Sequence, residues 1–247
     1  MKALIFSDVH ASNSTLAFLK KEISKYDLLI FSGDLTNMGE PVSFADDFIL
    51  IIKNAGIPLF WVPGNNDFGA TYDILNQEIP SLEGRVEEFK VSRPDKSGSR
   101  DAAPTVRRFT GVGGSPASWA GAYGGNKSVA QEKIAGTIFI SHYPPPRIFN
   151  YLMPGKSEGL SPIFENSNIE YRISKQIQNS KLEIRNSSLS ITKKLTYSPI
   201  VHICGHIHYQ QGIAYLGETK IIKLASAETG HYGILDLDNL EIDFRRF

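Results

Sequence analysis

Seven side chains able to bind metal ions follow short apolar runs at five places in the sequence. They are Asp8 and His10, Asp34, Asn65, His142, and His206 and His208. Carboxylate, amide and imidazole groups are all ligands of divalent cations. In extended backbone, residues i and i+2 point to the same side, so a D-x-H or H-x-H triplet can present two ligands in one direction. The sequence therefore predicts a metal site made of nitrogen and oxygen ligands.

Predicted strands precede all of these residues. We expect strands at Lys2–Phe6, Asp27–Phe31, Ile57–Val62, Thr137–Ser141 and Ile200–Cys204. Apolar residues at helical spacing predict helices at Ser12–Ser24 and Phe44–Asn54, between the first three strands. This alternation is typical of a parallel sheet covered on both faces. Because open α/β sheets bind ligands outside the carboxyl ends of their strands, we expect the seven side chains to meet at one rim.

The rest of the chain adds shorter elements around this sheet. We expect a helix at Tyr72–Glu78 and strands at Thr105–Val112, Gln211–Tyr215, Lys220–Leu224, Gly233–Leu237 and Glu241–Phe244. Arg93–Pro104 is polar and predicts a solvent loop. The segment at about 143–199 contains a helix candidate near Ile169–Gln178 and is the candidate lid, insertion or oligomer contact. No repeat or linker divides the chain, so residues 1–247 are expected to form a single domain.

Composition argues against several other kinds of protein. The 26 basic and 26 acidic residues cancel, which disfavours a nucleic-acid binder that depends on an overall basic surface. The single cysteine, Cys204, cannot form an internal disulfide and is expected to be a small buried hydrophobe. No apolar run reaches the roughly 18–20 residues of a membrane helix, and the N-terminus lacks a signal-peptide core. We therefore expect a cytoplasmic protein with no membrane partner.

The order of these blocks resembles the calcineurin-like metallophosphoesterase superfamily, whose signature is D-x-H, G-D, G-N-H-D/E, H and G-H-x-H. The matching blocks span Asp8 to His208. The resemblance implies an α/β fold, a four-layer α/β/β/α sandwich, with two metal ions. It implies that one ion is held by Asp8, His10, Asp34 and His208, and the other by Asp34, Asn65, His142 and His206, with Asp34 bridging.

The same resemblance implies a phosphoesterase mechanism. Two divalent ions about 3.5–4 Å apart would bind the phosphate oxygens, and a hydroxide bridging them would attack phosphorus in line. Imidazole, amide and carboxylate ligands without thiolate favour Mn²⁺, Fe or Zn²⁺ over Mg²⁺ or Ca²⁺. The expected cofactor is therefore a pair of such ions.

One position departs from the signature. The G-N-H-D/E motif is Gly64-Asn65-Asn66-Asp67 in this chain, so Asn66 stands where the family has a histidine that contacts the phosphate and helps the leaving group depart. An amide can donate a hydrogen bond but cannot deliver a proton as a general acid, and losing such an acid costs about 10²–10⁴ in rate. The departure resembles the small prokaryotic phosphodiesterases of this superfamily and disfavours protein-phosphatase activity.

Other side chains could assist at the site. His231 could approach it and replace the missing acid, or be a histidine of a surface turn. Arg147 could hold a substrate phosphate with two hydrogen bonds. His202 lies within a predicted strand and is expected to be structural. The candidate catalytic residues are therefore Asn66, Asp67 and His231, and the candidate substrate contacts are Asn66 and Arg147.

These observations favour a dinuclear phosphodiesterase acting on a small phosphate ester. Two alternatives stay open: a metal-binding scaffold or regulatory protein with little turnover, and a nuclease. Asn66 motivates the first. The neutral charge disfavours the second, and nucleic acid is not the preferred partner. The sequence leaves the oligomeric state open.

Overall fold

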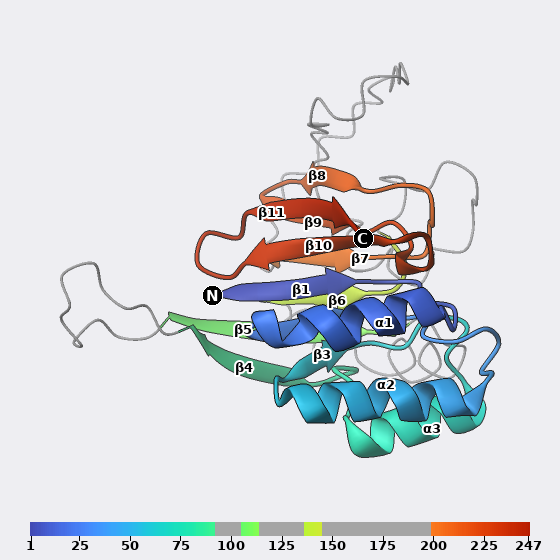
Figure 1. Ribbon diagram of the computed structural model, residues 1–247. Helices are drawn as coiled ribbons and strands as arrows, with labels where there is room; N and C mark the ends of the chain where they lie inside the picture. Colours follow the sequence, from blue (N-terminus) through green and yellow to red (C-terminus); the bar gives the residue numbers. More distant parts are fainter. Residues whose placement is uncertain (92–104, 114–135, 145–198) are drawn as a thin grey trace.

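Two β-sheets are stacked, and three helices cover the outer face of the first sheet (Figure 1). The computed structural model describes residues 1–91, 105–113, 136–144 and 199–247. The first sheet has the order β11 (Ile242–Arg246), β10 (His231–Asp236), β1 (Lys2–Phe6), β2 (Leu28–Phe31) and β3 (Leu59–Trp61). Strands β1, β2 and β3 are parallel, whereas β10 is antiparallel to β1 and β11 to β10.

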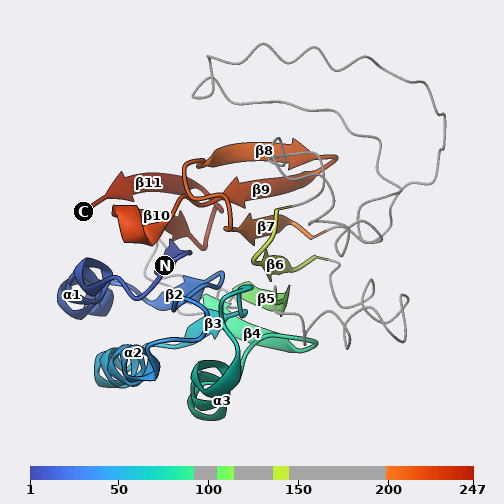
Figure 2. The ribbon, with the colours of Figure 1, turned by 90° about the vertical axis from the view of Figure 1, so that its right-hand side faces the viewer.

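The second sheet lies against the inner face of the first. Its order is β4 (Val86–Val91), β5 (Thr105–Val112), β6 (Ile138–Ser141), β7 (Val201–Cys204), β9 (Thr219–Lys223) and β8 (Gly212–Leu216). The inner four strands are parallel, and antiparallel strands β4 and β8 form the edges. Figure 2 shows the resulting layers, with the helices, the first sheet and the second sheet in succession.

The helices follow the strands of the first sheet. Helix α1 (Asn13–Glu22) begins after Ser12, whose Oγ accepts a hydrogen bond from the Thr15 N–H, as expected for an N-cap. Helix α2 (Val42–Ala55) ends at Gly56, which has a φ of 66°, the left-handed conformation that commonly ends helices. Helix α3 is Gly69–Glu78, and short 3₁₀ turns η1 and η3 lie at Ile23–Lys25 and Ala227–Thr229.

Alternation along the central strands divides the core into two layers. In β1, Leu4 and Phe6 face the helices, while Ala3 and Ile5 face the second sheet. Phe6 stacks on its neighbour Phe31 of β2, with ring centroids 5.0 Å apart. Fully burying one such side chain contributes about 1.5–3 kcal/mol. Both faces of the first sheet are therefore apolar, which explains the uninterrupted apolar runs in its strands.

The predicted alternation of strands and helices is confirmed. Boundaries differ by a few residues; for example, α3 begins at Gly69 rather than Tyr72. Strand β4, Val86–Val91, was not predicted, because half of the residues in its sequence VEEFKV are charged and only its last residue is fully buried. It pairs as an edge strand with β5, and charged side chains are usual on such edges.

The predicted α/β class with two stacked sheets is confirmed. The described residues contain no helix on the outer face of the second sheet, so the fourth layer stays a prediction. The whole of Arg93–Pro104, the helix near Ile169–Gln178 and nearly all of the candidate lid at 143–199 lie outside the described residues. The single-domain expectation likewise stays a prediction. Across the described part of the chain, no helix has the length and apolar character to cross a membrane.

His202 is a buried structural residue of β7, as predicted. Its Nε2 lies 2.6 Å from the hydroxyl of Ser141 on β6, and that hydroxyl donates to the Tyr143 carbonyl. Burial lowers the pKa of His202 to about 3. Between about pH 3 and pH 6.5 the His202 ring therefore stays neutral in the folded protein but binds a proton in the unfolded chain.

We expect His202 to weaken the metal-free fold in mild acid. Between its ordinary pKa of 6.5 and the folded value of about 3, the unfolded chain gains a proton that the folded chain cannot, so stability present above pH 6.5 is lost as the pH falls. At pH 5 this loss is about 2 kcal/mol relative to pH 7.5. His202→Gln should lose about 2 kcal/mol less than wild type over this range in urea unfolding with chelator. Identical pH dependence of the two proteins would contradict the prediction.

Candidate metal centre

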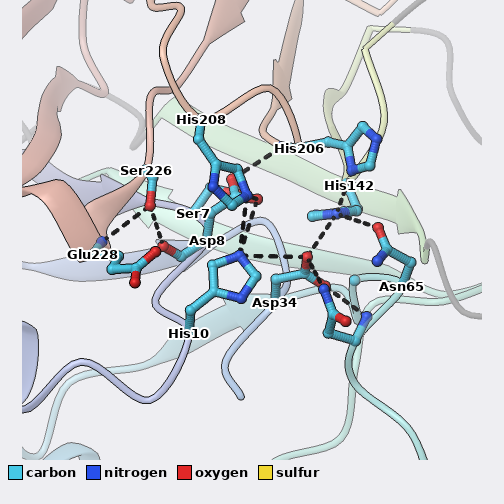
Figure 3. Close-up of polar contacts among 12 residues, drawn as sticks. Ser7, Asp8, His10, Asp34, Asn65, His142, His206, His208, Ser226 and Glu228 are labelled. Atoms are coloured by element: carbon cyan, nitrogen blue, oxygen red, sulfur yellow. Dashed lines mark hydrogen bonds and ion pairs between the residues drawn. The ribbon is translucent and has the colours of Figure 1, made fainter. Parts of the chain in front are cut away.

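The carboxyl ends of five parallel strands bring all seven predicted ligands together (Figure 3). Strand β1 leads into Asp8 and His10, β2 into Asp34, β3 into Asn65, β6 into His142, and β7 into His206 and His208. The ligands therefore come from both sheets, and the centre lies where the ends of the two sheets meet.

Asp8, His10 and His208 form the first ligand group. The Nε2 atoms of the two histidines lie 3.1 Å apart, and Asp8 Oδ1 lies 3.3 Å from Nε2 of His208 and 3.9 Å from Nε2 of His10. Asp8 Oδ1 is buried and has no hydrogen-bond donor among the described residues. Buried oxygens normally have a partner, so this arrangement fits a cation bound between the three side chains.

Asp34, His142 and His206 form the second group, and Asn65 lies beside it. His142 Nε2 is at the centre: it lies 3.3 Å from Asp34 Oδ2, 3.2 Å from His206 Nδ1 and 3.1 Å from Asn65 Oδ1. Asp34 Oδ2 also lies 3.7 Å from His10 Nε2 of the first group. One carboxylate oxygen thus faces both groups.

Hydrogen bonds select the histidine tautomers that metal binding requires. His10 Nδ1 lies 2.9 Å from Oδ1 of Asn37, whose Nδ2 donates to the His10 carbonyl. His142 Nδ1 lies 2.8 Å from the Ser32 carbonyl. Because both partners are acceptors, each Nδ1 carries the hydrogen and each Nε2 presents its lone pair to the centre.

The buried carboxylates create a need for positive charge. Burial disfavours ionised Asp34, but the adjacent His142 lowers the pKa of Asp34 overall. Burial also disfavours charged His142, yet Asp34 raises the pKa of His142 to about 9. Burial lowers the pKa of His206 to about 3, which keeps that ring neutral. In the ion-free protein a proton on His142 balances this charge, and a divalent cation would displace it.

Left-handed backbone at the ligands helps aim them. Asp8, His10, Asp34 and His206 have φ angles of 56°, 49°, 62° and 73°, a conformation that costs a non-glycine residue about 1–3 kcal/mol. Hydrogen bonds between the loops hold it in place. The Asp8 N–H donates to the Gly33 carbonyl at 2.9 Å, and the His206 N–H donates to Asp8 Oδ2 at 2.9 Å.

The 3₁₀ turn η3 holds the first of these loops from another side (Figure 3). Ser226 Oγ and the Glu228 N–H both donate to the Asp8 carbonyl, at 2.7 and 3.1 Å. The Ser226 N–H donates to the His208 carbonyl at 2.9 Å. The turn therefore joins two members of the first ligand group through their backbone.

Two motif glycines let the ligand loops approach closely. A Cβ on Gly64 would lie 2.1 Å from Asp34 Oδ1, and a Cβ on Gly205 would lie 1.8 Å from Ser7 Oγ. Neither distance is sterically allowed. Close packing around the ligands therefore requires glycine at positions 64 and 205. The φ angles of these two glycines are not in the left-handed region and do not require it.

Asn66 contacts Asp34 rather than projecting freely from the loop. Its backbone N–H donates to Asp34 Oδ1 and its side-chain Nδ2 donates to Asp34 Oδ2, each at 2.8 Å. The amide therefore lies against the carboxylate that faces both groups. Contact of Asn66 with a substrate phosphate stays a prediction.

Asp67 holds the loops together and does not face the ligands with a free oxygen. It is buried, and its Oδ2 accepts from the N–H groups of Asp34 and Gly64 while Oδ1 accepts from Leu35, all at 2.8 Å. Burial, and then the charge of Asp34, raises the pKa of Asp67 to about 6. Because its oxygens bind backbone groups, Asp67 positions these loops, and the catalytic role expected from the motif stays a prediction.

The remaining predicted residues lie elsewhere. His231 begins β10, and its Nδ1 lies 2.9 Å from Thr229 Oγ1. Within the described part of the chain, none of its hydrogen bonds reaches either ligand group. Arg147 lies outside the described residues. Cys204 is buried as expected, and burial raises the pKa of its thiol to about 12.

Sequence reasoning missed two residues that orient ligands. The hydroxyl of Tyr143 donates to Asn65 Oδ1 at 3.3 Å, and its ring centroid lies 4.3 Å from that of His206. Asn37 binds His10, as described above. Each had a signal: Tyr143 directly follows a predicted ligand, and Asn37 ends the polar run after β2.

Comparisons with known structures agree with this fold. The chain is similar to the crystal structure of TT1561 of Thermus thermophilus, with 16% identity, a TM-score of 0.61 and coverage of 99% of this chain and 98% of that one. It is also similar to purple acid phosphatase PPD1 from yellow lupin (Lupinus luteus) seeds, with 13% identity, a TM-score of 0.51 and coverage of 100% of this chain and 51% of that one. At these identities the likeness concerns the fold alone. No curated protein sequence matches the chain.

A family model described as calcineurin-like phosphoesterase matches residues 1–210. The match contains every member of both ligand groups, from Asp8 to His208. With two stacked sheets and the ligands at their carboxyl ends, the chain belongs to the calcineurin-like phosphoesterase family.

Proposed function

We propose that this metal-dependent phosphoesterase is a dinuclear phosphodiesterase that hydrolyses a small phosphate ester. The observation that carries the proposal is the position of Asp34 Oδ2, 3.3 Å from His142 Nε2 in one ligand group and 3.7 Å from His10 Nε2 in the other. A carboxylate placed between two histidine-containing groups suits two neighbouring cations better than one.

The donor set fits such ions. Asp8, His10 and His208 would hold one ion, His142, His206 and Asn65 the other, and Asp34 would contribute to both. Nitrogen and oxygen donors without sulfur favour Mn²⁺, Fe or Zn²⁺. When bound, a pair of such ions supplies Lewis acidity toward phosphate oxygens and makes water acidic enough to attack phosphorus at neutral pH.

The chain's own groups fix the positions of these ligands. Asn37 and Ser32 set the histidine tautomers, Tyr143 orients Asn65, and Asp67 holds the loops of Asp34 and Asn65 together. With a net charge of zero, attraction for phosphate has to arise locally at the cations rather than from an overall basic surface.

Asn66 supports the choice of substrate class. Its amide has no proton to give to a leaving oxygen, so the leaving group has to depart without this general acid. An aryl oxide such as p-nitrophenolate, whose parent phenol is far more acidic than an alcohol, meets that condition better than a serine alkoxide. Hydrolysis of a diester with such a leaving group is therefore the favoured reaction.

The test is hydrolysis of bis(p-nitrophenyl) phosphate by chelator-stripped protein supplied with Mn²⁺ or Zn²⁺. We expect turnover that depends on added metal and is lost in Asp8→Ala. No turnover with either metal would favour the alternative of a metal-binding scaffold. Turnover in Asp8→Ala equal to that of wild type would place the activity outside this centre.

A further inference from the structure

Lys223 is a fully buried lysine at the end of β9, next to the metal centre. In the register of the second sheet it pairs with Cys204, the last residue of β7. The loop that follows Cys204 carries His206 and His208. A buried lysine is rare unless its ammonium has partners, so its contacts indicate its role.

The ammonium of Lys223 binds backbone carbonyl groups around this loop. It donates to the carbonyl of Ile207 at 2.9 Å, to that of Gln210 at 3.3 Å, and to that of Leu224. Ile207 lies between the two histidine ligands, and Gln210 lies two residues after His208. The loop is therefore fixed at its middle and at its end by one side chain.

These contacts exclude other roles for the amine. Three carbonyl acceptors match the three N–H donors of an ammonium group, which leaves no lone pair for a nucleophile or base. Among the described residues no carboxylate lies within ion-pair distance of Lys223. Within the described part of the chain, Lys223 is thus a cation bound to backbone oxygens, and the nearby charge of Asp8 acts on it without a direct ion pair.

The loop held by Lys223 carries one histidine of each ligand group. His208 belongs to the group with Asp8 and His10, whereas His206 belongs to the group with Asp34 and His142. The backbone of His206 is left-handed, with a φ of 73°, so the loop needs external contacts to keep that conformation. A single residue that fixes the loop fixes one histidine of each group.

We propose that Lys223 is a positioning residue that holds His206 and His208 in place for two metal ions at once. This inference rests on the proposed dinuclear centre. It differs from the role of Asn37, which orients His10 and therefore one group only.

The experiment is a calorimetric titration of Mn²⁺ into chelator-stripped wild-type, Lys223→Met, Asn37→Ala and Lys220→Met proteins. Residues that hold metal ligands typically change metal affinity about 10–100-fold when replaced. We expect Lys223→Met to weaken both binding steps by that range and Asn37→Ala to weaken one. Lys220, on the same strand, donates to the distant Leu240 carbonyl at 2.7 Å, so Lys220→Met should bind both ions like wild type.

Two further measurements separate positioning from folding. Visible absorption of the Co²⁺-loaded proteins should show altered bands in Lys223→Met, because the geometry of the ligands changes even where the fold is intact. If Lys223→Met does not fold, Lys223→Arg decides: we expect weaker binding at both steps, since a planar guanidinium cannot reproduce three tetrahedral contacts.

The outcomes distinguish this inference from the function on which it rests. Wild-type binding at both steps by folded Lys223→Met, or by Lys223→Arg where Lys223→Met is unfolded, would overturn the role of Lys223 and leave the phosphoesterase proposal intact. Weakening of a single step would also overturn it. Failure of the wild-type protein to bind two ions would instead contradict the proposed dinuclear centre.

Discussion

Asp34→Asn is expected to lower metal-dependent hydrolysis of bis(p-nitrophenyl) phosphate by about 10³-fold or more. The change keeps the size of the side chain but removes the charge from the one oxygen that faces both ligand groups. Metal ions contribute several kcal/mol to stabilising the transition state, and about 4 kcal/mol corresponds to 10³ in rate. The measurement is kcat/KM at saturating Mn²⁺, together with the number of ions bound.

Asp27→Asn is the matched control for this change. Asp27 precedes β2 as Asp34 follows it, and its carboxylate accepts from the Lys2 N–H at the opposite end of the sheet. We expect wild-type activity and two bound ions in this control. Two tightly bound ions and near wild-type kcat/KM in Asp34→Asn would contradict the role assigned to Asp34.

The ligands could be predicted from sequence because each depends on local patterns. Asp8, His142 and His206 each come shortly after an apolar strand, so the sequence shows both the residue type and its place at a strand end. Parallel strands then align those ends, so proximity follows from topology without knowledge of the side-chain packing. The same logic placed side chains more than a hundred positions apart, such as Asp34 and His142, beside one another.

Residues that act through packing could not be predicted in this way. Lysine is normally exposed, so nothing in the sequence TKIIK indicates that Lys223 is buried on three carbonyl groups. Asp67 belongs to a catalytic motif, yet its oxygens bind backbone N–H groups that a sequence does not locate. Strand β4 could not be predicted either. Its charged residues suit an edge strand, and only its pairing with β5 in the folded protein places it at an edge.

The direction of the Asn66 side chain likewise required the structure. The motif indicates that a general acid is absent, but the hydrogen bond from Asn66 Nδ2 to Asp34 Oδ2 indicates what the amide does instead. It supports the carboxylate shared by both ligand groups. Any replacement of Asn66 therefore removes this side-chain hydrogen bond to Asp34. A test of acid catalysis has to separate the rate lost with that bond from the rate gained through a new proton donor.

Asn66→His is expected to shift substrate preference toward esters with poor leaving groups by about 10²-fold or more. The backbone N–H of residue 66 keeps its bond to Asp34 Oδ1, so the loop stays in place while an imidazole brings a proton donor to the centre. A general acid contributes about 10²–10⁴ where the leaving oxygen needs a proton and little where it does not. The measurement is kcat/KM for a dialkyl phosphate diester divided by kcat/KM for methyl p-nitrophenyl phosphate, a ratio in which metal occupancy cancels.

Asn66→Ala separates the two effects. It loses the side-chain bond to Asp34 but supplies no acid, so both substrates should slow together and their ratio should stay within about twofold of wild type. The ratio in Asn66→His should also fall as the pH rises above the ordinary imidazole pKa of about 6.5, because the acid form is then lost. An unchanged ratio in Asn66→His, with two ions bound, would mean that residue 66 does not reach the leaving oxygen and acts only through Asp34.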